Sequence, residues 1–461
     1  MKRSKARPTR SAWLILLLIA VLQAPRCAPR TPPPATPDFI AEHLRAAAIH
    51  VDAGAYTAAE AAYREALQAV PNNPQPLLEL ARLYRRWQRP QAGLAALDEA
   101  LRLGAAAREN GHAGAIAILR LELLAMAGNW SQVAIEATEH LRAYPNDGAA
   151  LQRLTQAYLQ DHECLAATTV AGRWYEAAPD DRDAALTWGL LAGDARLLCE
   201  TDAHLGEAAF CTTGAERTDP DVDIITALIR SGKWPLTACV LRRALTMTRE
   251  QSTSTAEMHA WLGEALVRVG RPAEAQPHLV AATNLAPEAP LGWLLLGMYY
   301  LGQQETEAAR EALLNARSLD PRNPAPYLAL AEATAQTGNY KEIEVWIAAA
   351  LEIAPTDAEI AKAAARFYLE RNLIDAVYPL RAIQKAIQLA PDDGETQMLL
   401  GRFRLLAGDQ SGAVAALDEA VKLDPGLGAA HYLRGLALQA TNKPTEAQQA
   451  FIRAADLGYF P

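Results

Sequence analysis

The chain is poor in the residues from which metal and catalytic sites are usually built. It has 5 cysteines and 9 histidines among 461 residues. It contains no Cys-x-x-Cys or His-Glu-x-x-His pair, the spacings typical of zinc sites. It also lacks a glycine-rich phosphate loop and a Gly-x-Ser-x-Gly nucleophile elbow. The sequence therefore predicts no catalytic centre, no metal site and no cofactor.

Positive charge is also scarce, and strand-like patterns are missing. The formal net charge is −9, whereas a phosphate-binding surface needs an excess of Lys and Arg. Nucleic acid is thus not an expected partner. A local basic cluster at Arg82, Arg85, Arg86 and Arg89 is interpreted as a solvated helix face. No alternating run of Val and Ile indicates a β-strand, which leaves an all-α chain.

What the chain does have is an internal repeat, whose period of roughly 34 residues is typical of helix–turn–helix arrays. One copy begins Trp293-x-x-Leu296-Gly297-x-x-Tyr300 and continues with Ala309, Leu313, Ala316 and Pro321. The same frame recurs along nearly the whole chain after residue 40. Its copies start at Ile40, Pro74, Gly114, Gly148, Thr218, Ala256, Pro290, Pro324, Ala358, Gly394 and Gly428. A further copy at 182–217 is degenerate, so the frame predicts about 11–12 repeats.

The recurring positions have simple physical roles. A small residue at position eight, such as Gly297, lets the two helices of one repeat approach closely. Gly in the turn, as at Gly128 and Gly338, supplies the left-handed conformation that ends a helix. Pro after the second helix, as at Pro71, stops it. Each repeat is therefore predicted to be a helix–turn–helix unit.

This pattern resembles the tetratricopeptide repeat (TPR) family. The resemblance implies an all-α, TPR-type α-solenoid, a right-handed superhelix of antiparallel helix pairs. We expect an N-terminal array at 39–181, a degenerate repeat or break at 182–217 and a C-terminal array at 218–461. The resemblance further implies a concave groove lined by the first helices, which binds a protein or peptide and performs no catalysis.

Six candidate groove residues follow from that register. They are charged residues expected on the inner side of the first helices: Arg82, Arg86, Glu332, Lys362, Arg366 and Arg402. The family's carboxylate clamp, Lys at position five with Asn at position nine, occurs in no repeat. Lys362, Arg366 and Arg402 are expected to converge as a basic patch that favours an acidic partner. In the alternative interpretation, Glu370 and other nearby carboxylates neutralise them.

The N-terminus has the pattern of a targeting segment. Residues 1–24 place five basic residues before a short apolar run, which predicts a signal peptide or short membrane anchor. Residues 25–38 are predicted to form a proline-rich linker. Cys27 is a candidate lipidation site, although Arg26 departs from the small-residue pattern of a lipobox. An exported protein is expected, either periplasmic, extracellular or membrane-anchored, with membrane association through this segment.

Four cysteines lie in or beside the degenerate unit: Cys164, Cys199, Cys211 and Cys239. In an oxidising compartment they can form disulfides, and sequence alone does not choose the pairing. A Cys199–Cys211 bridge would pin the segment between them, and Cys164–Cys199 is the rival pairing. Buried free thiols are the remaining interpretation.

Two functions fit these features. The first is an exported, non-catalytic scaffold that binds a protein or peptide partner in its groove. The second is an accessory or regulatory subunit of envelope polysaccharide or lipoprotein assembly machinery. The sequence leaves the identity of the partner and the oligomeric state open.

Overall fold

The computed structural model describes residues 37–104, 113–194, 197, 228–247, 252–373 and 377–461. Within these ranges the regular secondary structure is helical throughout, without a β-strand. The helices form antiparallel pairs joined by short turns. The first helices of the complete pairs are α2 (Pro37–Asp52), α4 (Gln75–Arg86), α7 (Ala113–Met126), α9 (Gly148–Gln160), α17 (Thr253–Arg268), α19 (Pro290–Gly302), α21 (Ala325–Thr337), α23 (Ala358–Glu370), α25 (Gly394–Leu406) and α27 (Gly428–Ala440). Their second helices are α3 (Tyr56–Ala69), α5 (Pro90–Arg102), α8 (Trp130–Ala143), α10 (Cys164–Ala177), α18 (Pro272–Leu285), α20 (Thr306–Leu319), α22 (Tyr340–Ile353), α24 (Val377–Leu389), α26 (Gln410–Leu423) and α28 (Pro444–Asp456).

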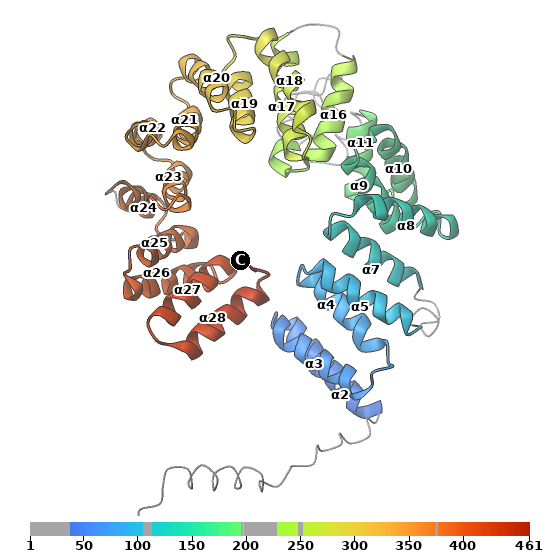
Figure 1. Ribbon diagram of the computed structural model, residues 1–461. Helices are drawn as coiled ribbons and strands as arrows, with labels where there is room; N and C mark the ends of the chain where they lie inside the picture. The colour runs from blue at the N-terminus through green and yellow to red at the C-terminus, as the bar shows by residue number, and fades with distance from the viewer. Residues whose placement is uncertain (1–36, 105–112, 195–196, 198–227, 248–251, 374–376) are drawn as a thin grey trace, which may run out of the picture.

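The pairs stack side by side into a solenoid that curves round into a ring (Figure 1). Each pair buries its apolar face on its neighbours, so the core consists of consecutive clusters of Ala and Leu rather than one centre. The predicted all-α solenoid is confirmed, and its helix pairs follow the predicted register.

The helix ends form where the repeat chemistry places them. Helix α3 ends at Ala69, just before Pro71. The turn glycines Gly128 and Gly338 have φ angles of 74° and 76°, the left-handed region that L side chains disfavour. Asp147 precedes α9 and caps it, because its carboxylate accepts hydrogen bonds of 3.0 and 3.2 Å from amides of the first turn. These local features follow from the sequence of a single repeat.

The small residue at position eight lies directly against the second helix of its own repeat. A Cβ on Gly297 would lie 2.6 Å from Cγ and 2.7 Å from Cδ2 of Leu313. Leu279, Leu417 and Phe451 approach Gly263, Gly401 and Gly435 in the same way. Because Leu313 is fully buried, it has little room to move aside. The close approach predicted from the repeat is therefore present.

We expect Gly297→Val to lower the free energy of unfolding by about 1–3 kcal/mol, the usual cost of overpacking a filled core. Gly302→Val is the matched control, since Gly302 lies in the same helix and a Cβ there would meet nothing within 4 Å. Thermal unfolding followed by circular dichroism measures both variants. Equal melting temperatures for the two would contradict the packing role of Gly297.

A disulfide links helices that lie on either side of the segment 182–217 in the sequence. Cys164, at the start of α10, is bonded to Cys239 in α16 (Trp234–Met247). The Cys164–Cys199 pairing is therefore wrong. The physical reason is that α16 packs against α9 and α11 (Arg182–Ala192), which brings the Cα atoms of Cys164 and Cys239 to 5.5 Å.

Several predictions concern residues outside the described ranges. These are the signal peptide or anchor at 1–24, most of the 25–38 linker, lipidation at Cys27 and the Cys199–Cys211 bridge. Beyond α11, most of the degenerate unit at 182–217 also lies outside them. In the part of the chain that the structure describes, no helix has both the length and the apolar character needed to cross a membrane.

Candidate functional site

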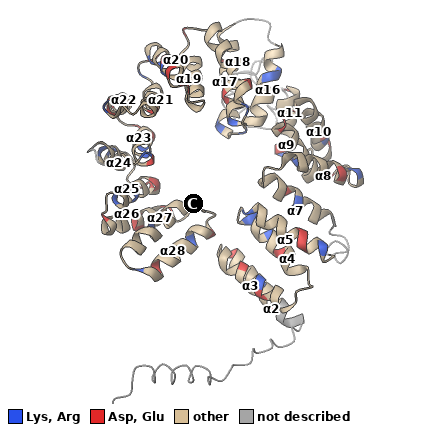
Figure 2. Cartoon of the chain, viewed as in Figure 1, with Lys and Arg blue, Asp and Glu red and all other residues tan. Residues whose placement is uncertain are grey.

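The inside of the ring is lined by the first helices of the pairs, with the second helices outside, as α7, α9, α19, α21 and α23 show in Figure 1. First helices of successive pairs touch directly, for example α17 with α19 and α25 with α27. We call this surface the inner face. Lys and Arg are interspersed with Asp and Glu around the ring, without one large block of either sign (Figure 2).

Three of the predicted groove residues have ion-pair partners close to them. Arg82 pairs with Glu79 at 2.6 Å, Arg86 with Asp52 at 4.0 Å, and Glu332 with Arg371. Exposed pairs of this kind contribute little to stability. Arg82, Arg86 and Glu332 therefore each have a nearby opposite charge.

The predicted basic patch is instead a mixed ion-pair cluster. Lys362 is buried, and its Nζ lies 2.6 Å from Glu359, 3.0 Å from Asp393 and 3.1 Å from Glu395. Arg366 lies 3.1 Å from Glu395 and 3.5 Å from Glu359. Two cations thus face three carboxylates, so this region has no excess positive charge.

Even with Arg402 counted, the region has three cations and three carboxylates, so it carries no net positive charge. The Arg402 guanidinium donates a long hydrogen bond of 3.5 Å to the backbone carbonyl of Leu369. Of the two interpretations that the sequence leaves open for Lys362, Arg366 and Arg402, the neutralised one therefore describes the site. The neutralising carboxylates are Glu359, Asp393 and Glu395, rather than the Glu370 that the sequence suggests.

A pocket of about 350 Å³ opens between three successive repeats. Arg85 of α4, Glu122 of α7 and Arg153 of α9 supply its polar wall, while Met126 and Trp130 supply its apolar wall. Arg85 and Arg153 lie 2.5 Å and 3.5 Å from the Glu122 carboxylate. Met126 is 41% exposed. We call this the three-repeat pocket.

The pocket carries one more positive charge than negative. Glu122 has two carboxylate oxygens, and each is directed to a different arginine. Arg153 also donates to the side-chain oxygen of Gln156 at 2.8 Å. Two guanidinium groups have more N–H donors than one carboxylate can accept. An anionic group beside apolar side chains is therefore the ligand chemistry that this wall favours.

The sequence contains a signal for this pocket. Arg85 stands at position twelve of the repeat that starts at Pro74, and Glu122 stands at position nine of the repeat that starts at Gly114. From sequence, Arg85 is nevertheless interpreted as part of a solvated basic cluster. The missing information is the offset between neighbouring repeats, which aligns position twelve of one repeat with position nine of the next.

Asp161 and His162 form the turn between α9 and α10, and Cys164 begins α10. His162 takes the left-handed conformation there, with φ of 60°, where several other repeats have glycine and others have Gln or Asn. Burial, reinforced by the charges of Arg271 and Arg242, lowers the pKa of His162 to about 4. Cys164 is held in its disulfide. Among the described residues, no group of three or more His, Cys, Asp or Glu is placed to hold a metal ion.

A model of the tetratricopeptide repeat family matches residues 262–324, 294–358 and 380–427. The family's repeat is therefore present in this chain, and the prediction made from its period is confirmed. Among curated proteins there is no match to the chain.

Similar solved structures include other tetratricopeptide repeat proteins. Yeast Tom70 is 14% identical, over 91% of this chain and 92% of that one, with a TM-score of 0.43. A tetratricopeptide repeat protein from Parabacteroides merdae is 17% identical, over 52% of this chain and 92% of its own, with a TM-score of 0.40. YrrB, described as a TPR protein with an unusual peptide-binding site, is 16% identical, over 41% and 95%, with a TM-score of 0.31. Likenesses of this degree say nothing about what this chain binds.

Proposed function

We propose that this chain is a non-catalytic scaffold that binds a protein or peptide segment on its inner face, with the three-repeat pocket as the principal contact. The observation that carries the proposal is the pairing of two arginines with one carboxylate beside the apolar side chains of Met126 and Trp130. The segment bound would present a carboxylate next to an apolar side chain. Tetratricopeptide repeats support a protein-interaction role in general.

The pocket fits a peptide better than a small metabolite. Its residues come from three consecutive repeats, so a ligand lying along the inner face meets them in turn. Arginine suits this role because its planar guanidinium binds carboxylates through two parallel hydrogen bonds. The apolar wall adds contact area without further polar groups to desolvate.

We expect the double variant Arg85→Glu with Arg153→Glu to bind the partner at least about tenfold more weakly, since a charge-assisted hydrogen bond contributes about 1.5–3 kcal/mol. Candidate partners are first captured by the wild-type chain and identified by mass spectrometry. The affinity of each purified candidate is then measured by calorimetry for the wild type and the variant.

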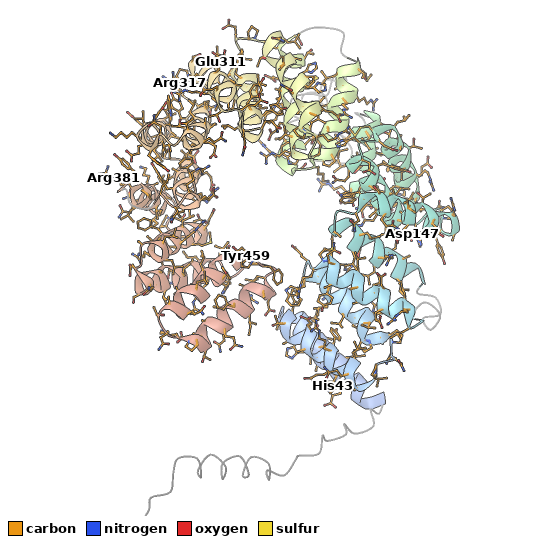
Figure 3. The ribbon with its side chains drawn as sticks, viewed as in Figure 1. His43, Asp147, Glu311, Arg317, Arg381 and Tyr459 are labelled. Carbon is orange, nitrogen blue, oxygen red and sulfur yellow. A yellow bond between two sulfur atoms is a disulfide. The ribbon has the colours of Figure 1, made fainter. Side chains whose placement is uncertain are left out.

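Arg381→Glu is the matched control, because Arg381 is exposed and points away from the inside of the ring (Figure 3). A partner that uses the inner face binds this control as well as it binds the wild type. A partner that tolerates the pocket variant but not Arg381→Glu would place binding on the outer face and overturn the proposal.

We further propose that the protein is exported, with residues 1–24 as signal peptide or anchor. The Cys164–Cys239 disulfide supports this, since disulfides persist mainly in oxidising compartments. In that setting an accessory role in envelope polysaccharide or lipoprotein assembly is the second candidate function. N-terminal sequencing of natively expressed protein tests export, which an intact Met1 on a cytoplasmic product would contradict.

A further inference from the structure

The two ends of the solenoid meet and close the ring (Figure 1). The last turn of α28, with residues 457–460, packs against α3 and the turn that follows α4. We call this the closure contact. One of its hydrogen bonds, from Thr57 to Asp456, joins positions that are 399 apart in the sequence. The C-terminal side supplies a carboxylate that caps α3, and the N-terminal side supplies an indole N–H that donates to a carbonyl of α28.

The first of these groups is the Asp456 carboxylate. Helix α3 starts after Ala55, whose side chain cannot cap its amides. Asp456 accepts a hydrogen bond of 2.8 Å from the backbone N–H of Thr57, and it is 8% exposed. An anion at the positive end of a helix is stabilised by the exposed N–H groups and by the helix dipole. Asp456 thus caps α3 from the opposite end of the chain.

The second group is the indole of Trp87, the residue that follows α4. It is 2% exposed, and its Nε1–H donates to the carbonyl of Ala455 at 2.5 Å. The Phe460 ring lies 6.0 Å from the indole. The Arg89 guanidinium lies 4.8 Å from the Trp87 ring and 5.1 Å from the Phe460 ring. Cation–π contacts of this kind stabilise an aromatic cluster.

The closure contact has the features of a joint that opens. Successive pairs elsewhere in the ring are held by the chain itself, whereas α28 and α3 are held only by noncovalent contacts. Helix α28 touches α3 less extensively than α27 touches α26 and no more than α22 touches α23, but α22 and α23 are also joined by the chain. Tyr459 and Phe460 remain 37% and 51% exposed, and Tyr459 lies at the edge of this joint in Figure 3. Regions with few buried contacts open at low free-energy cost.

We infer that the closure contact is a latch: the surface formed by Thr57, Trp87 and Arg89 is a docking site for this chain's own Asp456–Phe460 segment, and its release opens the ring. Opening requires no repeat to unfold, because the helices on each side keep their neighbours. The latch does not depend on the proposed partner binding. If the inner face does bind a partner, the open ring admits a chain that would otherwise have to thread through a closed one.

The test compares the wild type with the double variant Asp456→Ala and Phe460→Ala, which removes the capping carboxylate and the aromatic contact. Small-angle X-ray scattering should show a larger radius of gyration for the variant at the same molecular mass. Hydrogen exchange at the Thr57 amide should be about fivefold faster, the factor that corresponds to ~1 kcal/mol for a helix cap. The Glu307 amide is an internal reference, since it holds the same position in α20, which has no side-chain cap.

Two further variants keep the result interpretable. Trp87→Phe removes only the indole N–H and retains an aromatic ring, so it should open the ring in part while circular dichroism stays unchanged. Tyr340→Ala removes an aromatic residue that is 60% exposed on α22, and it should leave scattering and exchange as in the wild type.

Two outcomes would overturn the inference. Identical scattering and identical Thr57 exchange in the wild type and the double variant would show that the contact does not hold the ring. A wild-type mass of two or more chains, reduced to one chain by the double variant, would show that the segment docks on a neighbouring copy instead.

Discussion

Loss of the Cys164–Cys239 disulfide should destabilise the region around α10 and α16 by about 4 kcal/mol, as expected for a loop of this length. The sequence separation of the two cysteines is 75. The cross-link therefore restricts a long segment of the unfolded chain, which is the main source of its stabilising effect. In the folded chain it fastens α16 to α10 across the degenerate unit.

The measurement is denaturant unfolding of the wild type and Cys239→Ser, each with and without reductant. The wild type should lose stability when reduced, and Cys239→Ser should already be destabilised and respond no further. Because repeats in a solenoid can unfold separately, hydrogen exchange in α10 and α16 should accompany the global curve. The loss should be largest in these two helices.

Cys199→Ser is the matched control, and it also tests the rival Cys164–Cys199 pairing. Because the bridge joins Cys164 to Cys239, hydrogen exchange in α10 and α16 of this variant should match the wild type and stay sensitive to reductant. The opposite pattern in these two helices, with exchange insensitive to reductant in Cys199→Ser and unaffected in Cys239→Ser, would restore the Cys164–Cys199 pairing.

Features set within one repeat were predictable from the sequence. Gly297 and Leu313 lie in the two helices of one repeat, and their contact follows from the helix–turn–helix unit alone. The helix end before Pro71 and the left-handed Gly128 depend only on local backbone chemistry. At these positions the local backbone preferences and the packing of the folded chain favour the same helix boundaries. The repeat period therefore predicted the helix positions correctly.

Features that depend on the curvature of the whole array were not predictable. The hydrogen bond from Trp87 to Ala455 exists only because small rotations between successive pairs add up to a ring. The Cys164–Cys239 bridge depends on how α16 packs beyond the degenerate unit, where the period is lost. Neither geometry is encoded in the spacing of a single repeat.

The cluster around Lys362 lies between these two cases. Asp393 and Glu395 belong to the start of the next repeat, about one period after Lys362, so their proximity could have been inferred from the register. When the cations Lys362, Arg366 and Arg402 are considered without the carboxylates of the neighbouring repeat, they predict a basic patch. In an array of this kind, the charge of a site is set by adjacent repeats together.

Replacing Lys362 with Met should lower the free energy of unfolding by about 2 kcal/mol at neutral pH, less than the ~3–5 kcal/mol for breaking a fully buried ion pair. The substitution keeps the apolar stem and removes the charge. It leaves Glu359, Asp393 and Glu395 close together with Arg366 as their remaining cation. The smaller value is expected because these carboxylates keep contact with water.

Lys422→Met is the matched control. Lys422 also pairs with a carboxylate in the preceding helical turn, Glu419 at 3.0 Å, but its side chain is 74% exposed. An exposed pair of this kind contributes less than about 1 kcal/mol. Equal losses of stability in the two variants would show that the buried cluster has no special role.

The pH dependence gives this prediction a second test. Burial alone would raise the pKa of Asp393, but hydrogen bonds from Thr396 and Lys362, with the Lys362 charge, lower it below its ordinary value. Burial would likewise lower the pKa of Lys362, but its carboxylate partners raise it above its ordinary value. A lowered acid pKa stabilises the fold above the ordinary aspartate value near 4, and this stabilisation is lost on acidification. A raised lysine pKa stabilises the fold below about 10.4, and this stabilisation is lost at higher pH.

The difference in stability between the wild type and Lys362→Met should therefore be largest on a plateau between about pH 5 and pH 9 and should shrink below about pH 4. Denaturant unfolding at a series of pH values measures this difference directly. Comparing the two chains at each pH cancels the titration of groups that they share, such as His162. A difference that stayed constant down to pH 3 would mean that the carboxylates do not stabilise the fold through Lys362, and that the lost packing of the lysine stem accounts for the effect.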